Sequence, residues 1–263
     1  MKLLTLNCHS WLEENQLDKI RILAETIKEQ SYDVIALQEV SQKLNPENID
    51  GELKHDNFVL FLLEELKQIG VTGYEFVWEC AHIGFDIYEE GVALLTKHPV
   101  EKTYSFFVTK SSDITNWKAR RIVGAKIRYQ GKLVRFYSCH LGWWHDEQES
   151  YEHQVDSLFS KINEESPFFL MGDFNNDANT RHEGYDYLLS KGVFDAYHLA
   201  NTKDDGATVV GEIKGWDDNK EDLRIDLILT STDVEVKSSK VIFNGKHKPV
   251  ISDHYGIEVE VNL

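Results

Sequence analysis

The stretch Phe168-Phe169-Leu170-Met171-Gly172-Asp173-Phe174-Asn175 decides the fold of this chain. It begins as a short apolar run, which is typical of a buried strand. Gly172 interrupts the run, and Asp173 and Asn175 follow at the carboxyl end of the predicted strand. In α/β folds this end of a strand is where ligands and catalytic groups gather. Taken alone, the stretch fits an ordinary turn better, because Asp, Asn and Gly all favour turns.

The same pattern, an apolar run that ends on a polar side chain, recurs along the chain. Strands are predicted over residues 2–7, 33–39, 74–80, 91–96, 104–109, 122–129, 133–138, 223–229, 240–244 and 256–261. Helices are predicted over residues 15–30, 58–69, 146–163 and 185–191. Residues 41–57 and 208–222 are polar and irregular, which favours loops. No repeat or flexible linker interrupts the series, so we expect residues 1–263 to form a single domain.

The composition limits the class of protein. A formal net charge of −17 over 263 residues opposes binding to a polyanion, so nucleic acid is an improbable partner and a small phosphorylated substrate suits the chain better. Three cysteines show no spacing typical of a metal site, and reduced thiols are typical of cytoplasmic proteins. No apolar run resembles a signal peptide or a membrane span, and we expect a cytoplasmic protein without membrane contact. No feature indicates an obligate protein partner.

Eight polar residues stand at or near predicted strand ends, and together they suggest a catalytic site. They are Asn7, Glu39, His140, Asp173, Asn175, Asp226, Asp253 and His254. Each has a simpler explanation when taken singly; Asp226, for example, could pair with Arg224. As a group, however, they contain the carboxylates that Mg²⁺ needs and histidines that can bind phosphoryl oxygens.

The roles of these groups follow from their chemistry. Glu39 and Asp253 are candidate metal ligands, and Asp173 can orient or deprotonate a water molecule. Each histidine needs an acid behind it, for which Asp226 and one of Glu89 or Glu90 are candidates. The chain has no Ser or Cys in a nucleophile-elbow pattern, which favours direct attack by water.

These residues occur in motifs that resemble those of the endonuclease/exonuclease/phosphatase superfamily, which includes deoxyribonuclease I and AP endonucleases. The motifs are LTLN (ending at Asn7), IALQEV (with Glu39), YSCHLG (with His140), MGDFNN (with Asp173 and Asn175), RIDLIL (with Asp226) and SDHYG (with Asp253 and His254). They run in the family's order from residue 4 to residue 256. The opening LNCHSWLEENQ is similar to a narrower group, the RgfB-like proteins and bacterial maltose 6'-phosphate phosphatases.

The resemblance implies an α/β fold that is a four-layer sandwich, in which two mixed β-sheets pack face to face with helices outside. It implies Mg²⁺ near Glu39, with Asn7 and Asp253 close by; Mn²⁺ suits the same oxygen ligands. It also implies catalytic and phosphate-binding roles for a further set of residues: His140 backed by Glu90, His254 backed by Asp226, Asp173 and Asn175 at the water and the phosphate, and a basic phosphate contact from Arg121 or Arg120.

The substrate is expected to be small. Trp11, Trp117, Trp143, Trp144 and Trp216 would form an aromatic rim, and Trp143 in particular is a candidate substrate contact, since flat aromatic faces suit sugar rings. The leading hypothesis is therefore Mg²⁺-dependent hydrolysis of a sugar phosphate such as maltose 6'-phosphate. The alternatives are a nuclease, whose basic groove would need Arg120, Arg121 and residues 246–248, a sphingomyelinase-like phosphodiesterase, and a non-catalytic regulatory partner.

Overall fold

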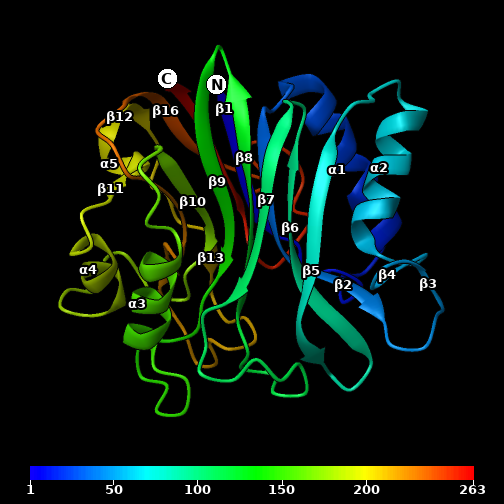
Figure 1. Ribbon diagram of the computed structural model, residues 1–263, viewed down its shortest axis with the longest axis horizontal. Helices are drawn as coiled ribbons and strands as arrows, with labels where there is room; N and C mark the ends of the chain where they lie inside the picture. The colour runs from blue at the N-terminus through cyan, green and yellow to red at the C-terminus, as the bar shows by residue number, and fades with distance from the viewer.

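The computed structural model, which describes residues 1–263, contains two mixed β-sheets packed face to face (Figure 1). The larger sheet contains, in spatial order, β12 (Ala200–Lys203), β16 (Glu235–Ile242), β17 (Gly256–Asn262), β1 (Lys2–Asn7), β2 (Val34–Lys43), β6 (Tyr88–Thr96) and β5 (Glu75–Gly84). The smaller sheet contains β11 (Phe194–Asp195), β15 (Asp226–Thr230), β10 (Phe168–Asp173), β9 (Lys132–His140), β8 (Arg121–Tyr129) and β7 (Val100–Phe107).

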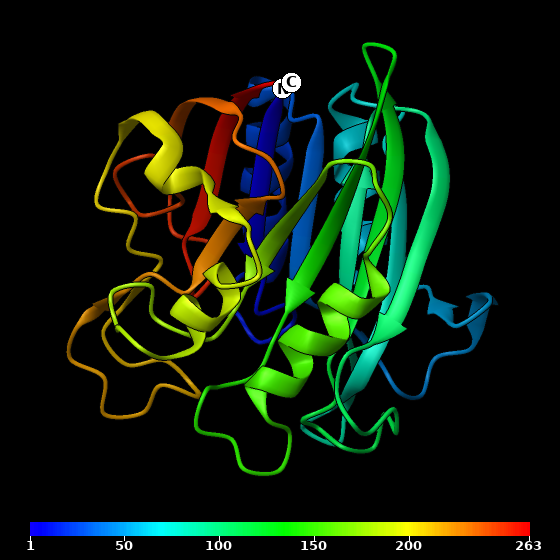
Figure 2. The same ribbon diagram turned by 60° about the vertical axis from the view of Figure 1, so that its left-hand side comes forward.

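Helices cover both outer faces of this pair of sheets (Figures 1 and 2). The five helices are α1 (Gln16–Gln30), α2 (Phe58–Gln68), α3 (Tyr151–Lys161), α4 (Gly184–Leu189) and α5 (Ala196–Leu199). α1 and α2 pack on the larger sheet, and α3 and α4 pack on the smaller one. The four-layer sandwich that the sequence predicts is therefore confirmed.

The central strands are buried on both faces, which explains their continuous apolar sequences. In β1, Leu3 points into the core between the sheets, whereas Leu4 packs with α1 and α2. The smaller sheet shows the same alternation in β10, where Phe169 faces the core between the sheets and Leu170 faces the helices α3 and α4. None of the helices is both long enough and apolar enough to cross a membrane.

The sheet register brings the polar strand ends together. Asp173, the last residue of β10, is paired with His140 of the parallel strand β9 and with Asp226 of the antiparallel strand β15. Gly172 makes this close pairing feasible, because its φ is 152° and a Cβ atom would lie only 1.9 Å from the carbonyl oxygen of Cys139. Only glycine fits at that position.

Several predicted elements differ from those observed. The predicted loop over residues 41–57 contains a small hairpin, β3 (Asn48–Asp50) and β4 (Leu53–Lys54), and two further strands, β13 (Val209–Val210) and β14 (Asp222–Leu223), frame the irregular segment after residue 208. The helix predicted over residues 146–163 begins only at Tyr151. The strand predicted over residues 240–244 is the end of the longer β16.

Candidate active site

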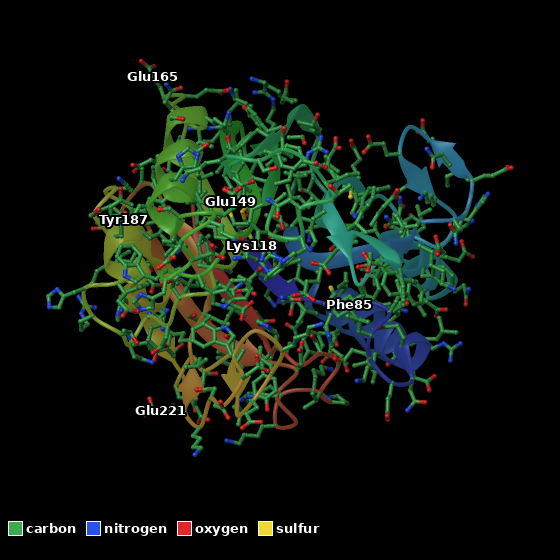
Figure 3. All side chains as sticks on the ribbon, turned by 90° about the horizontal axis from the view of Figure 1, so that it is seen from below. Phe85, Lys118, Glu149, Glu165, Tyr187 and Glu221 are labelled. Atoms are coloured by element: carbon green, nitrogen blue, oxygen red, sulfur yellow. The ribbon has the colours of Figure 1, made fainter.

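A cleft of about 580 Å³ opens where strands of the two sheets end. Figure 3 looks onto this end of the molecule, where Phe85 of the cleft lies near the middle of the view. The cleft is lined by ten of the residues predicted from sequence: Glu39, Glu90, Trp117, Arg120, His140, Trp143, Asp173, Asn175, Asp253 and His254. Residues from opposite ends of the chain therefore share one cavity.

Asp173 lies at the centre of a buried polar network. Its Oδ2 atom is 3.6 Å from Nε2 of His140 and 3.9 Å from Nε2 of His254. Asp226 accepts a hydrogen bond from Nδ1 of His254 over 2.9 Å. The simpler explanation for Asp226 does not hold, because Arg224 instead forms an ion pair with Asp195.

The surroundings give the two histidines different charges. Burial, together with the charges of Arg120, His82 and His254, holds the pKa of His140 well below its usual range. Burial also opposes the charged form of His254, but the carboxylates of Asp226 and Asp173 outweigh it and raise its pKa to about 10. At neutral pH His140 is neutral and His254 is positively charged.

The surroundings of Asp173 raise the affinity of its carboxylate for a proton. Burial and the charge of Asp226 raise the pKa of Asp173 to about 7, although His254 and the hydrogen bond from the backbone N–H of Asn175 act in the opposite direction. A carboxylate whose pKa lies near neutral pH can accept a proton from water more readily than an ordinary aspartate.

Asn175 and Asn7 hold Asp173 in place. The backbone N–H of Asn175 donates to Oδ1 of Asp173, and the Asn175 amide donates to the carbonyl of Leu141. The amide of Asn7 donates to Glu39 over 2.9 Å and to Asp173 over 3.2 Å. Asn7 thus links the acid of the larger sheet to the acid of the smaller sheet.

Glu39 is presented by a distorted strand. It has a φ of 51°, in the left-handed region, where the pairing of β2 with β6 shifts register. Bulges of this kind re-aim side chains near active sites. Burial and then the charges of Glu90 and Asp253 raise the pKa of Glu39 to about 8. A bound cation would relieve this concentration of negative charge.

The donor set around Glu39 fits a hard divalent cation. Ligand atoms of Glu39, Glu90 and His140 lie within 4.8 Å of one another, and the charge of Asp253 also acts on Glu39. Oxygen-rich sets with one or two carboxylates are typical of Mg²⁺ and Mn²⁺ sites.

The pairing of Glu90 differs from the one implied by the family resemblance. Oε1 of Glu90 is 3.2 Å from Nε2 of His82, and no ion pair joins Glu90 to His140. His82 was not among the residues predicted from sequence. It lies opposite Glu90 in the β5–β6 hairpin, so only the strand register, which the sequence does not fix, could have revealed this partner.

The two neighbouring arginines face different surroundings. Arg120 lines the cleft and is only 4% exposed, yet its guanidinium forms no hydrogen bond or ion pair with the protein. Arg121 lies outside the cleft, where Nη2 is 2.8 Å from Glu79 and Nη1 donates to the carbonyl of Cys80. Arg121 is therefore not placed to contact a substrate in this cleft.

Only two of the five tryptophans predicted to form a rim line the cleft, namely Trp117 and Trp143. Their ring centroids are 6.2 Å apart. Trp144 packs against Tyr151, and Trp11 against Phe58 and Phe61. Trp216 donates a hydrogen bond to Asn175. Of the adjacent tryptophans, Trp143 therefore lines the cleft, whereas Trp144 packs against the protein.

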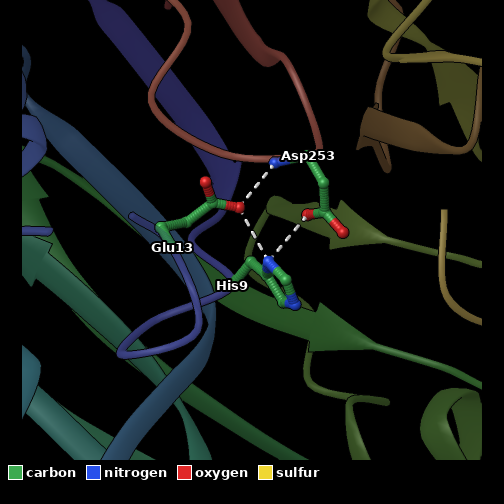
Figure 4. A group of neighbouring side chains, drawn as sticks. All are labelled: His9, Glu13 and Asp253. Carbon is green, nitrogen blue, oxygen red and sulfur yellow. Dashed lines mark hydrogen bonds and ion pairs between the residues drawn. The ribbon is translucent and has the colours of Figure 1, made fainter. Parts of the chain in front are cut away.

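A second polar group at the edge of the cleft was also missed (Figure 4). Nδ1 of His9 is 2.7 Å from Oε1 of Glu13 and 3.6 Å from Oδ1 of Asp253. The backbone N–H of Asp253 donates to the same Oε1 atom of Glu13. The motif LNCHSWLEENQ contains both His9 and Glu13 but gives no sign that they meet the SDH loop.

Comparisons with known proteins agree with this fold. The model of the endonuclease/exonuclease/phosphatase family matches residues 5–254, so the chain belongs to that family. Members of the family hydrolyse phosphate esters. No curated protein compared with the chain matches it in sequence.

Solved structures include close and distant relatives. An endonuclease/exonuclease/phosphatase family protein from Leptotrichia buccalis is 43% identical over 100% of both chains, with a TM-score of 0.95. The mannosyl-6-phosphatase Bt3783 of Bacteroides thetaiotaomicron is 18% identical over 100% of both chains, with a TM-score of 0.71. A conserved protein from Enterococcus faecalis is 18% identical over 100% of this chain and 99% of that one, with a TM-score of 0.69. The two distant relatives support the fold alone.

Proposed function

We propose that this chain is a phosphomonoesterase that depends on Mg²⁺ or Mn²⁺ and releases phosphate from a sugar phosphate such as maltose 6'-phosphate. The observation that carries the proposal is the unpartnered, buried guanidinium of Arg120 in the same cleft as His140 and His254. The guanidinium lies over the ring of Trp143, with 5.7 Å between Cζ and the ring centroid, and a phosphate group would supply the hydrogen bonds that this buried cation lacks.

The residues of the cleft support direct attack by water. Asp173, with its raised pKa, would accept a proton from the attacking water. His254, kept charged by Asp226, would stabilise the negative charge of the phosphoryl oxygens. His140, which stays neutral, would add a hydrogen bond without adding charge.

The remaining polar groups would bind the phosphate and the metal. Arg120 would hold a phosphoryl oxygen, while Glu39 and Asp253, with Asn7 beside them, would hold the cation. When bound, a divalent cation neutralises the phosphate and the leaving alkoxide.

Two features support a sugar as the leaving group. Trp117 and Trp143 line the cleft, and Trp117 is 53% exposed, so an apolar face is available to a sugar ring. The distant relative named as a mannosyl-6-phosphatase has the same fold. We expect the protein to act as a single catalytic domain over residues 1–263, without an obligate protein partner.

Phosphate release by the purified protein with Mg²⁺ tests the proposal, with maltose 6'-phosphate, glucose 6-phosphate, mannose 6-phosphate and an inositol phosphate as substrates. We expect selective release from a sugar phosphate, and a loss of turnover of about 10²–10⁴-fold in Asp173→Ala and His254→Ala. His247→Ala, outside the cleft, is the matched control and should keep its turnover. Near-normal turnover in the folded Asp173→Ala variant would refute the assignment of the base.

A further inference from the structure

We propose that His9 binds the leaving alcohol of the substrate by accepting a hydrogen bond from one of its hydroxyl groups at Nε2. This inference rests on the proposed phosphatase function and names a substrate contact that the family motifs do not include. It explains the His9 and Glu13 part of the opening motif, which the proposed reaction leaves without a role.

The imidazole ring of His9 is held by a hydrogen bond at only one of its two nitrogen atoms. Its Nδ1 atom lies 2.7 Å from Oε1 of Glu13, and Glu13 is also bound by the ammonium group of Lys19 through Oε2. Nε2, in contrast, makes no hydrogen bond with the protein, and Figure 4 shows it pointing away from Glu13 and Asp253. His9 lines the cleft, and its side chain is 21% exposed.

The backbone adopts a costly conformation to present this ring. His9 has a φ of 44°, and Trp11 and Asn15 in the same loop also have positive φ values, 63° and 53°. Left-handed backbone at non-glycine residues costs free energy and persists where the surroundings enforce it. Here the enforcing contacts include the hydrogen bond from Ser10 to the carbonyl of Glu39 and that from the backbone N–H of Trp11 to Gln16.

The hydrogen bond at Nδ1 determines what Nε2 can bind. Glu13 is a carboxylate held by Lys19, so it accepts from Nδ1, and in the neutral imidazole the lone pair is then on Nε2. An acceptor at the edge of the cleft suits a hydroxyl group. His9 follows β1 of the larger sheet, whereas Asp173 belongs to the smaller sheet. In-line displacement puts the attacking water and the leaving alcohol on opposite sides of phosphorus, so an alcohol leaving on the side of the larger sheet would approach His9.

Two substitutions separate this role from a purely structural one. The amide of His9→Asn reaches the position of Nδ1, so it keeps the contact with Glu13 and lacks the group in the cleft. The longer amide of His9→Gln reaches the position of Nε2 and offers an acceptor there. His247→Asn, outside the cleft, is the matched control.

The readout is the ratio of kcat/KM for the sugar phosphate of the panel that the wild type hydrolyses fastest to kcat/KM for p-nitrophenyl phosphate, whose leaving group has no other hydroxyl. We expect His9→Asn to lower this ratio about tenfold, the effect of one lost hydrogen bond. His9→Gln should retain most of the ratio, and His247→Asn should not change it. Melting curves of all variants verify that they are folded.

The opposite order would overturn the inference: if His9→Gln is impaired on both substrates and His9→Asn is not, His9 only supports Glu13 and Asp253. Equal losses on both substrates that excess Mg²⁺ restores would make His9 a metal ligand and would also overturn it. If the wild-type protein releases phosphate from none of the sugar phosphates of the panel, the proposed function fails first and this inference fails with it. Normal turnover of both substrates by both variants would overturn this inference alone.

Discussion

Arg120 and Arg121 are neighbours in sequence, but only the first lacks a partner. Hydrogen bonds to a charged group contribute about 1.5–3 kcal/mol, so we expect Arg120→Gln to raise the KM for a sugar phosphate by about 10–100-fold. Arg121→Gln breaks the ion pair with Glu79 and should leave KM within about twofold, because its side chain lies outside the cleft. Steady-state kinetics of the two variants decide the point, and an equal rise in both would argue against a phosphate site at Arg120.

The ionised form of Glu39 is costly to the metal-free folded protein. Burial and the charges of Glu90 and Asp253 raise its pKa to about 8. The native state therefore holds a proton that the unfolded state releases between pH 4.5 and about 8, and the metal-free protein loses stability as the pH rises through this window.

Glu39→Gln removes this charge. At pH 8 we expect the metal-free variant to melt at least roughly 2 °C above the wild type, and to lose most of the increase in Tm that Mg²⁺ gives the wild type. Thermal melts with Mg²⁺ and with a chelator measure both effects. The exposed Glu165 supplies the control, Glu165→Gln, which should behave as the wild type; a Mg²⁺ effect of the same size in Glu39→Gln would exclude Glu39 as a ligand.

The polar strand ends could be predicted at the scale of single residues because a β-strand places its last residue at the edge of a sheet. His140 and Asp173, the last residues of the parallel strands β9 and β10, meet for this reason, and Asp226 joins them as the first residue of the antiparallel strand β15. His82 and His9 could not be predicted, because their positions depend on the register of a hairpin and on a loop with positive φ angles. Neither has a reliable sequence signal.

At the scale of elements, Asp33 ties three segments of the larger sheet together. Its carboxylate accepts hydrogen bonds from the backbone N–H of Lys2 and from Nε2 of His98, each over 2.7 Å. Burial opposes the ionised form, but these bonds and Lys97 outweigh it and lower the pKa of Asp33. The contribution of Asp33 to stability is therefore present above its ordinary pKa of 3.8 and is lost as the pH falls through the lower pKa of the folded state.

We expect Asp33→Asn to lower the free energy of unfolding at pH 7 by about 1–3 kcal/mol, with a smaller difference from the wild type below pH 3.8. Urea unfolding at several pH values measures the effect. Asp233→Asn, at an exposed turn, should have little effect at any pH. A destabilisation by Asp33→Asn that persists unchanged in acid would show that packing, rather than charge, accounts for it.

Helices whose apolar residues recur at helical spacing were predicted well. The start of a helix that is fixed by hydrogen bonds between side chains and the backbone was not. α1 and α2 lie within a residue or so of their predicted bounds. The segment before α3 was predicted to be helical, but Asp146 accepts hydrogen bonds from the backbone N–H groups of Gln148 and Glu149, and Ser150 caps the helix at Tyr151. Such hydrogen bonds between side chains and the backbone compete with helix formation. In the sequence, the residues that form them look the same as polar residues on the exposed face of a helix.

At the scale of the whole molecule, charge and surface shape both oppose a nuclease. The chain carries a net charge of −17, and the basic residues that could have formed a groove are dispersed. Lys246 and Lys248 line a separate cavity of about 520 Å³, which shares no residue with the cleft, and Lys248 pairs with Glu29. Arg121 is likewise neutralised by Glu79. The basic residues expected to form one groove therefore do not line a common cavity.

This distribution of charge predicts that single- and double-stranded DNA neither bind nor are cut in about 0.15 M salt, even with Mg²⁺ present. Gel-shift and cleavage assays at the same protein concentration as the phosphatase assay test it, with Asp173→Ala as the control for contaminating nucleases. Binding of DNA depends on releasing counterions from phosphates that lysine and arginine neutralise, and the cleft offers few such side chains around Arg120. Cleavage of DNA by the wild type that Asp173→Ala abolishes would reverse this conclusion, because it would show that this cleft cuts DNA despite the negative charge of the whole protein.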